Sequence, residues 1–404
     1  MCDMVQLRMF TPSSDAIVVG AGIVGAACAY ALSRAGLSVT VIEARAAASG
    51  TSSQGEGNIL VSDKEPGPEL TLGLYSLSRW EQITGELQEF LPTGFPSIEY
   101  DRKGGLVVAT TEAGAPPLLD FARTQRPAGV TAVEVDHDEA LRLEPQLNPA
   151  VTAAVRYPQD AQVQPVIATE AFLAAARRLG ARTLFGEEVV GPIIADDGRI
   201  AGVRTHRGSR PAGLVIIACG PWSARVADQL GSWLPVRPRR GVLLVTTRMP
   251  HLIIHKVYDA DYVGAVGSDD QGLQTSSVIE STAAGTVLIG SSRRQSGFDQ
   301  ALDLAAAREI ARKAITIFPF LATASVMRTY GGFRPFMPDH LPAIGPDPRV
   351  PGLWHATGHE GAGIGLSIGT ADLITSLIAG TPPPVDPAPF APSRLGEPAS
   401  VGDP

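Results

Sequence analysis

The chain has 404 residues, of which 44% are hydrophobic and 18% are charged, and its formal net charge is −8. This composition is typical of a folded globular protein and argues against a disordered chain or a coiled coil, which both need more charge. At roughly 150 residues per domain, the length predicts two to three folding units. The acidic balance, with no basic run longer than Arg237–Arg240, disfavours a nucleic-acid partner.

The cysteines, at positions 2, 28 and 219, form no Cys-x-x-Cys pair, so neither a disulfide framework nor a cysteine metal site fits. This usage predicts a cytoplasmic location. No apolar stretch reaches the roughly 18 residues that span a bilayer, and the N-terminal residues lack the apolar region of a signal peptide. Peripheral attachment to the inner membrane through a complex is the alternative.

The first elements in chain order form one strand–helix–strand unit. A β-branched run at 15–19 predicts a buried strand, and a small-residue pattern at 26–35 predicts a helix that Gly36 ends. A second apolar strand follows at 37–42 and ends in Glu43. Near-continuous apolar strands on either side of a helix indicate a parallel βαβ crossover whose sheet is covered on both faces.

The rest of the chain alternates between helical and strand-like patterns. A polar loop is expected at 48–57, and glycine- and proline-rich chain from 326. The prolines after Thr381 predict a flexible tail. The expected elements are helices at 69–90, 164–179, 301–317 and 366–378, and strands at 98–110, 153–163, 188–194, 200–205, 213–219, 241–247, 257–265, 273–280, 286–290 and 353–357.

Nucleotide-type elements occur in separated stretches, and mostly β segments fill the gaps between them. Two interleaved domains explain this order better than two consecutive ones. We expect an α/β fold in which a discontinuous, Rossmann-like domain interleaves with an α+β substrate domain that is built on an antiparallel sheet. The expected bounds are 15–95, 164–223 and 326–380 for the first domain, 96–163 and 224–325 for the second, and 1–14 and 381–404 for flexible termini.

A glycine motif lies between the first strand and the first helix. Gly20, Gly22 and Gly25 match GxGxxG, and Glu43 follows eighteen residues later at the end of the second strand. In this context the glycines let backbone N–H groups approach a pyrophosphate at a helix N-terminus, and the carboxylate binds a ribose hydroxyl. The motif therefore predicts a dinucleotide site; an ordinary glycine turn is the alternative.

A second glycine-rich turn, His355–Ser367, leads from a strand into the last helix. The N-terminus of that helix offers unpaired N–H groups and the positive end of a dipole. A reduced flavin carries negative charge near N1 and the C2 carbonyl, which such a helix end stabilises. This turn favours FAD over NAD, although a glycine loop that merely packs closely is the alternative.

Further segments match one family of flavoproteins, and they are Ala48–Ser53, Ala218–Ser223, Gly331–Pro335, Pro338–Asp339 and Gly345. With the two glycine turns they resemble the D-amino-acid oxidase and glycine oxidase family of FAD-dependent oxidoreductases over residues 15–380. A finer similarity points to the flavin (beta) subunits of opine and D-hydroxyproline dehydrogenases and of hydrogen cyanide synthase. The segments that carry it are Ser52–Asn58, Ser62–Pro68 and Gly290–Arg293.

The resemblance implies an FAD domain roofed by the sheet of a substrate domain, with FAD bound non-covalently. The chain has no cysteine after Cys219, so attachment through a cysteine in the later segments is excluded. No metal is expected. The expected cofactor contacts are Gly20, Gly22, Ile23, Val24, Gly25, Glu43, Ala44, Arg45, Thr51, Ser52, Ser53, Gly57, Asn58, Val189, Cys219, Gly220, Trp222, Gly332, Gly358, His359, Gly361, Gly363, Ile364 and Gly365.

Candidate catalytic residues come from the roof and from the last turn. By its motif, Arg334 is implied to anchor a substrate carboxylate, which a guanidinium pairs bidentately; a surface position or an ion pair with Asp339 is the alternative. His255, Tyr258 and Tyr262 lie on roof strands and either enclose the substrate or pack. His359 is placed near the flavin or is structural. The acidic residues between 136 and 144 are expected on a solvated helix face.

The predicted function is an FAD-dependent dehydrogenase or oxidase. It takes a hydride from a small amino acid or secondary amino acid to flavin N5 and leaves an imine; the substrate classes are D-amino acids, hydroxyproline, glycine and opines. Oxygen, a quinone or a partner subunit accepts the electrons, and a small iron–sulfur or second flavoprotein subunit is a candidate partner. The alternatives are a heteromeric subunit with a structural FAD and an NAD(P)H-dependent flavin hydroxylase.

Overall fold

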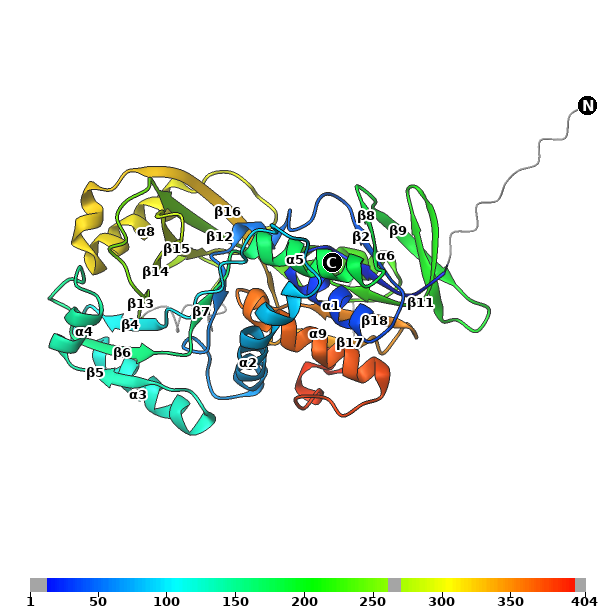
Figure 1. Ribbon diagram of the computed structural model, residues 1–404, viewed down its shortest axis with the longest axis horizontal. Helices are drawn as coiled ribbons and strands as arrows, with labels where there is room; N and C mark the ends of the chain where they lie inside the picture. The colour runs from blue at the N-terminus through cyan, green and yellow to red at the C-terminus, as the bar shows by residue number, and fades with distance from the viewer. Residues whose placement is uncertain (1–12, 261–269, 397–404) are drawn as a thin grey trace, which may run out of the picture.

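The computed structural model describes residues 13–260 and 270–396. Two large sheets lie toward opposite ends of the molecule, and the long helices lie between and around them (Figure 1). Each sheet is assembled from segments far apart in the sequence, so the chain passes repeatedly from one sheet to the other. The expected interleaved α/β architecture is therefore confirmed.

The first sheet is centred on β1 (Ser14–Val19), which pairs in parallel with β2 on one side and β11 on the other. Its strand order is β17-β18-β11-β1-β2-β8, and β9 and β10 extend from β11 as antiparallel strands. The remaining strands are β2 (Val39–Glu43), β8 (Arg182–Phe185), β9 (Val189–Ile194), β10 (Ile200–Thr205), β11 (Gly208–Ile217), β17 (Ala343–Pro346) and β18 (Leu353–Thr357).

Both faces of this sheet are buried. Ala16 and Val18 of β1 belong to a core shared with α1 (Ile23–Arg34), α5 (Pro165–Arg178) and α9 (Gly363–Ala379). The alternate residues Ile17 and Val19 face a second core, to which β9, β10 and α6 (Ser223–Gln229) contribute. Coverage of both faces explains why β1 is apolar at successive positions.

The second sheet has the strand order β16-β12-β15-β14-β13-β4-β6-β5. Its neighbours pair antiparallel, except that β13 and β4 pair in parallel. The strands are β4 (Gly105–Ala109), β5 (Val133–Val135), β6 (Ala153–Tyr157), β12 (Arg237–Thr246), β13 (Lys256–Asp259), β14 (Gln274–Ser281), β15 (Val287–Arg293) and β16 (Val326–Phe336).

The two faces of the second sheet have different roles. Val242 and Leu244 of β12 pack into a core with α8 (Leu304–Ile317), which covers one face. The alternate residues Gly241 and Leu243 line a cavity that faces the first sheet. The remaining elements of this region are α3 (Ala115–Gln125), α4 (His137–Leu143) and the 3-10 segments at Arg126–Ala128 and Pro319–Thr323.

The helix α2 (Pro68–Gln88) packs along α9 and holds its first turns. The Ser76 hydroxyl donates to the Gly365 carbonyl at 2.5 Å, and Trp80 Nε1 donates to the same carbonyl at 3.1 Å. Two short strands, β3 (Asn58–Ile59) and β7 (Ala161–Gln162), pair beside this helix pair. The beginning of α9 is thus fixed by side chains from a distant part of the sequence.

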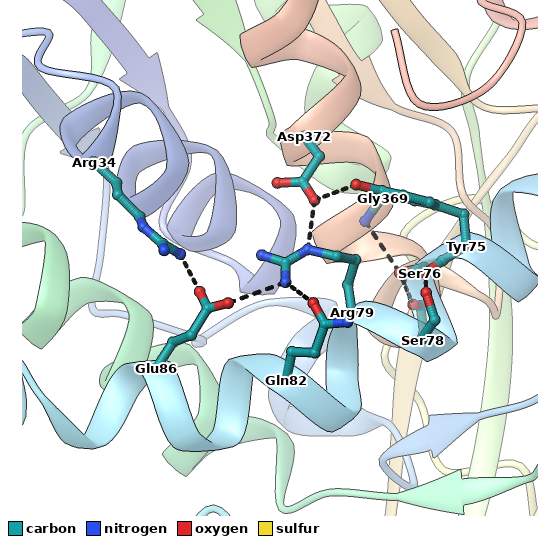
Figure 2. A network of polar contacts seen from close by, with 10 residues as sticks. Arg34, Tyr75, Ser76, Ser78, Arg79, Gln82, Glu86, Gly369 and Asp372 are labelled. Carbon is teal, nitrogen blue, oxygen red and sulfur yellow. Dashed lines mark hydrogen bonds and ion pairs between the residues drawn. The ribbon is translucent and has the colours of Figure 1, made fainter.

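A network of charges continues along the same helices (Figure 2). Arg79 of α2 donates through Nε to Asp372 of α9 at 3.0 Å and through Nη1 to Glu86 at 3.1 Å. Glu86 also pairs with Arg34 at the end of α1. Tyr75 donates to Asp372 at 2.8 Å. One network therefore joins three helices that pack against the first sheet or one another.

Two predictions about the end of the chain differ from the structure. Residues 326–336 form β16, which pairs with β12 from Arg237 to Thr246, so they extend the second sheet and not the nucleotide domain. The segment 381–396 packs on the molecule instead of being flexible: Phe390 is 1% exposed, and Arg394 Nε donates to Asp339 at 2.7 Å. Among the described residues, no helix is both long and apolar enough to cross a membrane.

Candidate cofactor and substrate site

A cavity of about 510 Å³ lies where the carboxyl ends of β1, β2 and β11 meet the second sheet. Val19, Ile42 and Ala218 line its floor at those strand ends, which is the usual position of ligands on open parallel sheets. Gly241 and Leu243 of β12 and the segment Gly332–Pro335 of β16 line the opposite wall. Both sheets therefore contribute to one site.

The first glycine turn forms the floor at one end of this cavity, and its glycines serve two purposes. Gly20 has φ +107°, and a Cβ there would lie 2.5 Å from the Ala218 carbonyl oxygen; a Cβ on Gly25 would lie 2.1 Å from the Gly20 oxygen. These two glycines are required by the packing of the chain itself. A Cβ on Gly22 would meet only Ser52 Oγ, at 3.2 Å, so chain packing alone does not demand glycine there.

Gly22 instead faces the cavity at the start of α1. Ser52 Oγ accepts a hydrogen bond from the Ile23 N–H at 2.9 Å and holds the polar segment 49–52 against this helix end. Because Gly22 has no side chain, its backbone is open to the cavity beside the positive end of the helix dipole. Such a cradle fits a pyrophosphate group.

Glu43 lies at the end of β2, beside the same turn. Its Oε2 accepts from the Ala21 N–H and its Oε1 accepts from the Arg45 N–H, both at 2.9 Å. The two backbone donors orient the carboxylate along the cavity wall, where Ala44 and Arg45 also lie. A carboxylate held in this position fits the ribose hydroxyls of a dinucleotide.

The second glycine turn lines another part of the cavity, and a Cβ on Gly363 would lie 3.9 Å from Val24 Cγ2 of α1. His359, Gly361, Gly363 and Ile364 line it, and α9 begins at Gly363, so the N-terminus of a helix faces the cavity. His359 is buried, and its Nε2 lies 2.9 Å from Thr370 Oγ1. Burial lowers the pKa of His359 to about 3, so its imidazole is neutral near pH 7. Positive potential at this end therefore comes from the helix and not from His359.

A charged bridge ties this turn to the second sheet. Glu360, at φ +46°, accepts from His340 Nδ1 at 2.8 Å and pairs with Arg239 Nη1 at 3.5 Å. Arg239 is fully buried on β12, where its guanidinium lies 5.4 Å from the centre of the Phe336 ring. The bridge was not predicted, because its members are far apart in sequence and match no motif.

Arg334 lies on β16 and lines the cavity beside Gly241. Its Nη1 donates to the Ser292 carbonyl at 2.8 Å, and a Cβ on Gly241 would lie 2.3 Å from that nitrogen. Gly241 thus makes room for the guanidinium on the cavity wall. Asp339, the alternative ion-pair partner for Arg334, pairs with Arg394 at 2.7 Å.

Two other candidate catalytic residues do not line this cavity. His255 Nδ1 lies 3.0 Å from the buried Glu144, and the Tyr258 hydroxyl lies 3.4 Å from Asp160 Oδ2. Their polar atoms have partners within the substrate sheet and its neighbours, in accord with the packing alternative. Glu144 is fully buried and does not lie on a solvated face. Tyr262 lies outside the described residues.

Most of the expected cofactor contacts do line the cavity. Those that line it are Gly20, Gly22, Ile23, Val24, Glu43, Ala44, Arg45, Thr51, Ser52, Asn58, Val189, Cys219, Gly220, Trp222, Gly332, His359, Gly361, Gly363 and Ile364. The expected contacts outside the lining are Gly25, Ser53, Gly57, Gly358 and Gly365. Close chain packing accounts for several of these glycines: a Cβ on Gly57 would lie 1.9 Å from the Val163 oxygen, and one on Gly358 would lie 2.5 Å from Met337 Cγ.

The structure also adds lining residues that the sequence did not indicate. Four of them lie inside segments that the sequence singled out but were not predicted as contacts, and the others match no motif. The added residues are Gln54, Glu56, Glu187, Glu188, Arg225, Gly241, Leu243, Phe333 and Glu360. Within residues 13–260 and 270–396, no cluster of His, Cys, Asp or Glu is arranged to hold a metal ion.

Two glycine turns, the Glu43 carboxylate and a wall that carries Arg334 line one cavity, and this set fits a dinucleotide-binding oxidoreductase. The sequence profile of the "FAD dependent oxidoreductase" (DAO) family matches residues 15–377, and the chain belongs to this family. FAD is accordingly its cofactor, and the cavity with a turn for the pyrophosphate and a helix end for the flavin fits it. The chain is an FAD-dependent oxidoreductase of a family that acts on amino acids and amines.

Named proteins of similar sequence and structure support this assignment. The chain is 29% identical to hydrogen cyanide synthase subunit HcnC of Pseudomonas aeruginosa, over 96% of this chain and 98% of that protein. It is 29% identical to the glycine oxidase of the same organism, over 94% and 99% of the two chains. The crystal structure of glycine oxidase from Geobacillus kaustophilus superimposes with a TM-score of 0.85, at 28% identity, over 95% and 99% of the two chains.

Proposed function

We propose that the protein oxidises the amine of a small amino acid or secondary amino acid to an imine, which water then hydrolyses. The observation that carries this proposal is the position of Arg334, which lines the cofactor cavity on the wall opposite the strand ends. The similar proteins named glycine oxidase and hydrogen cyanide synthase subunit are consistent with an amino-acid substrate.

Arg334 supplies the recognition of the acid group. Its guanidinium remains charged at any working pH and presents parallel N–H donors that match a carboxylate. The hydrogen bond from Nη1 to the Ser292 carbonyl limits rotation of the side chain. A substrate carboxylate paired with Arg334 would hold the adjacent α-carbon against the cavity wall formed by β12 and β16.

Bound FAD supplies the two-electron acceptor for hydride removal from the α-carbon. The chain contributes the positive end of α9 at the second glycine turn, which favours the negative charge of a reduced ring. Because His359 is neutral and buried, it adds no net charge there. Stabilisation by a helix end is independent of pH, whereas a histidine would contribute only when protonated.

Non-covalent attachment of FAD is part of the proposal. Cys219 lines the cavity, and its Sγ lies 3.1 Å from the Val19 carbonyl oxygen. Burial raises the pKa of its thiol, which disfavours the nucleophilic thiolate. Acid precipitation of the purified protein should leave the yellow colour in the supernatant. Colour that stays in the pellet would contradict this expectation.

An anaerobic titration tests the reaction itself. The purified protein is mixed without oxygen with glycine, sarcosine, D-proline, the hydroxyproline isomers and opines, and flavin absorbance is followed. We expect at least one of these compounds to bleach the flavin. Bleaching by NADPH and by none of the amino acids would favour a flavin hydroxylase, and an unchanged spectrum throughout would indicate a structural FAD.

The electron acceptor is tested in a second step. Re-oxidation by air after substrate reduction would identify an oxidase, and re-oxidation by a quinone or an added partner subunit would identify a dehydrogenase. Because the similar hydrogen cyanide synthase protein is named as a subunit, we include a heteromeric dehydrogenase in the proposal. Size-exclusion chromatography after co-expression with a candidate iron–sulfur or flavoprotein subunit would detect such a complex.

A further inference from the structure

A second charged side chain, Glu56, lines the same cavity as Arg334. It lies between the 3-10 turn η1 (Thr51–Gln54) and β3, and it is 8% exposed. Its Oε1 is buried and has no hydrogen-bond partner among the described residues. Buried carboxylate oxygens are normally paired, because an ionised group without donors is costly in a protein interior. Glu56 Oε1 therefore points to a donor that a ligand supplies.

The chain makes specific room for this oxygen. A Cβ on Gly290 of β15 would lie 1.9 Å from Glu56 Oε1 and 2.7 Å from Leu243 Cδ2. Any side chain at 290 would displace the carboxylate or the leucine. The absence of a side chain at 290 thus allows the carboxylate to reach the wall of the second sheet.

A chain of polar contacts holds the other oxygen of Glu56. Asn58 Nδ2 donates to Glu56 Oε2 at 3.0 Å, and Asn58 Oδ1 accepts from Lys256 Nζ. Because lysine only donates and a carboxylate accepts, these partners define the orientation of the amide. Oε2 is therefore occupied within the protein, and Oε1 is the oxygen that remains for a ligand.

Lys256 does not pair with Glu56 in this arrangement. Its Nζ lies 2.5 Å from Glu280 Oε2, and both side chains are almost completely buried on adjacent strands. Lys256 is thus held by direct contacts with Glu280 and with the Asn58 amide oxygen. Among residues 13–260 and 270–396, no cation of the protein pairs with Glu56, so a cationic ligand group would complement its negative charge.

The strand β12 relates Glu56 to Arg334. The Cβ position of Gly241 lies beside Arg334 Nη1, and Leu243 lies beside the Gly290 position that Glu56 Oε1 approaches. Gly241 and Leu243 are two residues apart on one face of the strand, which separates them by about 7 Å. Arg334 and Glu56 therefore lie near neighbouring positions on one face of β12, as the carboxylate and the amine on one α-carbon would require.

We propose that Glu56 Oε1 accepts a hydrogen bond from the substrate amine while Arg334 pairs with its carboxylate. The inference rests on the proposed function and deepens it: the site selects α-amino acids with at least one N–H. It disfavours carboxylic acids without an amine, because these leave Glu56 buried and unpaired. It also disfavours α-hydroxy acids, whose neutral hydroxyl is a weaker donor to a carboxylate than an ammonium.

The test compares Glu56→Gln and Glu56→Asp with the FAD-loaded wild-type protein. The probe is the panel amino acid that reduces the flavin fastest, together with its amine-free counterpart: acetate for glycine or cyclopentanecarboxylate for D-proline. Reduction at limiting amino acid and the dissociation constant of the acid, from the shift in flavin absorbance, are both measured. Glu309→Gln, an exposed carboxylate on α8, is the matched control.

Glu56→Gln should slow reduction by the amino acid about 10- to 100-fold, since a charge-assisted contact is lost. The same variant should bind the amine-free acid several-fold more tightly, because the glutamine amide removes the repulsion and donates. Glu56→Asp should retain part of the preference for the amino acid, and Glu309→Gln should match wild type. Opposite changes for the two probes are a signature that a general loss of structure does not produce.

Two results would overturn the inference. One is a Glu56→Gln variant that keeps the wild-type ratio between amino acid and amine-free acid. The other is a variant that weakens both probes equally while retaining FAD, which would give Glu56 a structural role. If no member of the panel reduces wild type, the proposed function itself fails. If wild type is reduced but Glu56→Gln gives either result above, only the inference about Glu56 fails.

Discussion

The two ends of the cavity are built in different ways. At the nucleotide end, Gly22 exposes backbone to the cavity, Gly20 and Gly25 allow the turn to pack, and the Ala21 and Arg45 N–H groups hold Glu43. At the roof end, the groups proposed to recognise the ligand are charged side chains, and Arg334 and Glu56 line the cavity from segments nearly 280 residues apart.

This difference indicates which substitutions each end can accept without affecting the other end. Backbone recognition within one short unit requires the turn to be intact, so the cofactor end tolerates few substitutions. Side-chain recognition on a preformed sheet requires only a charge at a given place, so the roof end can change its ligand while the fold persists. Variants at the two ends should accordingly fail in different ways.

The largest effect is expected at Gly22. Gly22→Val should weaken FAD binding by about 100-fold or more, because its side chain would enter the space of the pyrophosphate and each 1.4 kcal/mol lost is tenfold. The apoprotein should still fold, since a Cβ there meets only Ser52 Oγ. Flavin content per protein and thermal unfolding measure the two effects.

The matched control is Gly25→Val at the same turn. Its Cβ would lie 2.1 Å from the Gly20 oxygen, so this variant should lower the yield of folded protein and not only its flavin content. Normal flavin content in Gly22→Val would disprove the assignment of the turn to the pyrophosphate. It would also remove the contrast between the two ends.

Substitutions of Arg334 should affect chemistry and spare the cofactor. Loss of a charge-assisted bidentate contact costs about 1.5–3 kcal/mol, so Arg334→Ala should reduce flavin about 10- to several-hundred-fold more slowly at limiting substrate. Arg334→Lys should recover part of the rate, because an ammonium keeps the charge without the planar fork. Anaerobic stopped-flow reduction and flavin content are the measurements.

The decarboxylated amine of the best substrate serves as the control for Arg334. Wild type should prefer the acid, and Arg334→Ala should lose that preference. An alanine variant that reduces as fast as wild type at low substrate would return Arg334 to a structural role. A variant without FAD would show that the roof arginine also serves the cofactor end.

An effect on stability alone is expected at Asp347, which contacts His355 at the start of the second glycine turn. Its buried Oδ2 lies 2.7 Å from His355 Nε2, and its Oδ1 accepts from the N–H groups of Arg349 and Val350. Burial by itself would raise the pKa of Asp347, but these hydrogen bonds hold it well below its usual value. Asp347→Asn should lower the free energy of unfolding near pH 7 by about 1.5–3 kcal/mol.

The sign of the pH dependence follows from that lowered pKa. The stabilisation from Asp347 is present above the unfolded pKa of about 4 and is lost as the pH falls through the folded value. The difference between wild type and Asp347→Asn, measured by urea unfolding, should therefore be constant near neutral pH and shrink in acid. A stability difference that grows in acid would contradict this account. A changed substrate preference in Asp347→Asn would show that Asp347 affects the substrate site as well as stability.

Local patterns allowed the nucleotide end to be predicted. The first strand, glycine turn and helix lie within residues 14–34, and β18 and α9 surround the second turn closely, so periodicity and spacing carry the signal. The strand β16 was missed because its Gly331–Gly332 pair and Pro335 lower its intrinsic strand propensity. Pairing with β12 outweighs that propensity.

The roof end shows where sequence reasoning stops. Alternation predicts that Tyr258 lies on a strand, but only the folded structure shows that its hydroxyl contacts Asp160 and does not line the cavity. The pair Lys256–Glu280 joins two charges that each appear isolated within apolar strands. For the tail, proline content predicted flexibility, whereas the burial of Phe390 holds the chain in place.

The position of β1 has a consequence for synthesis of the chain. β1 is central in its sheet, but β11, one of its two neighbours, begins only at residue 208. At about 5–20 residues per second, a ribosome takes on the order of ten seconds or more to make the missing strand. During that delay the nascent chain carries an apolar strand with an open edge. Expression should therefore depend on chaperones and on low temperature more than the stability of the finished enzyme suggests, and truncations before residue 208 should aggregate.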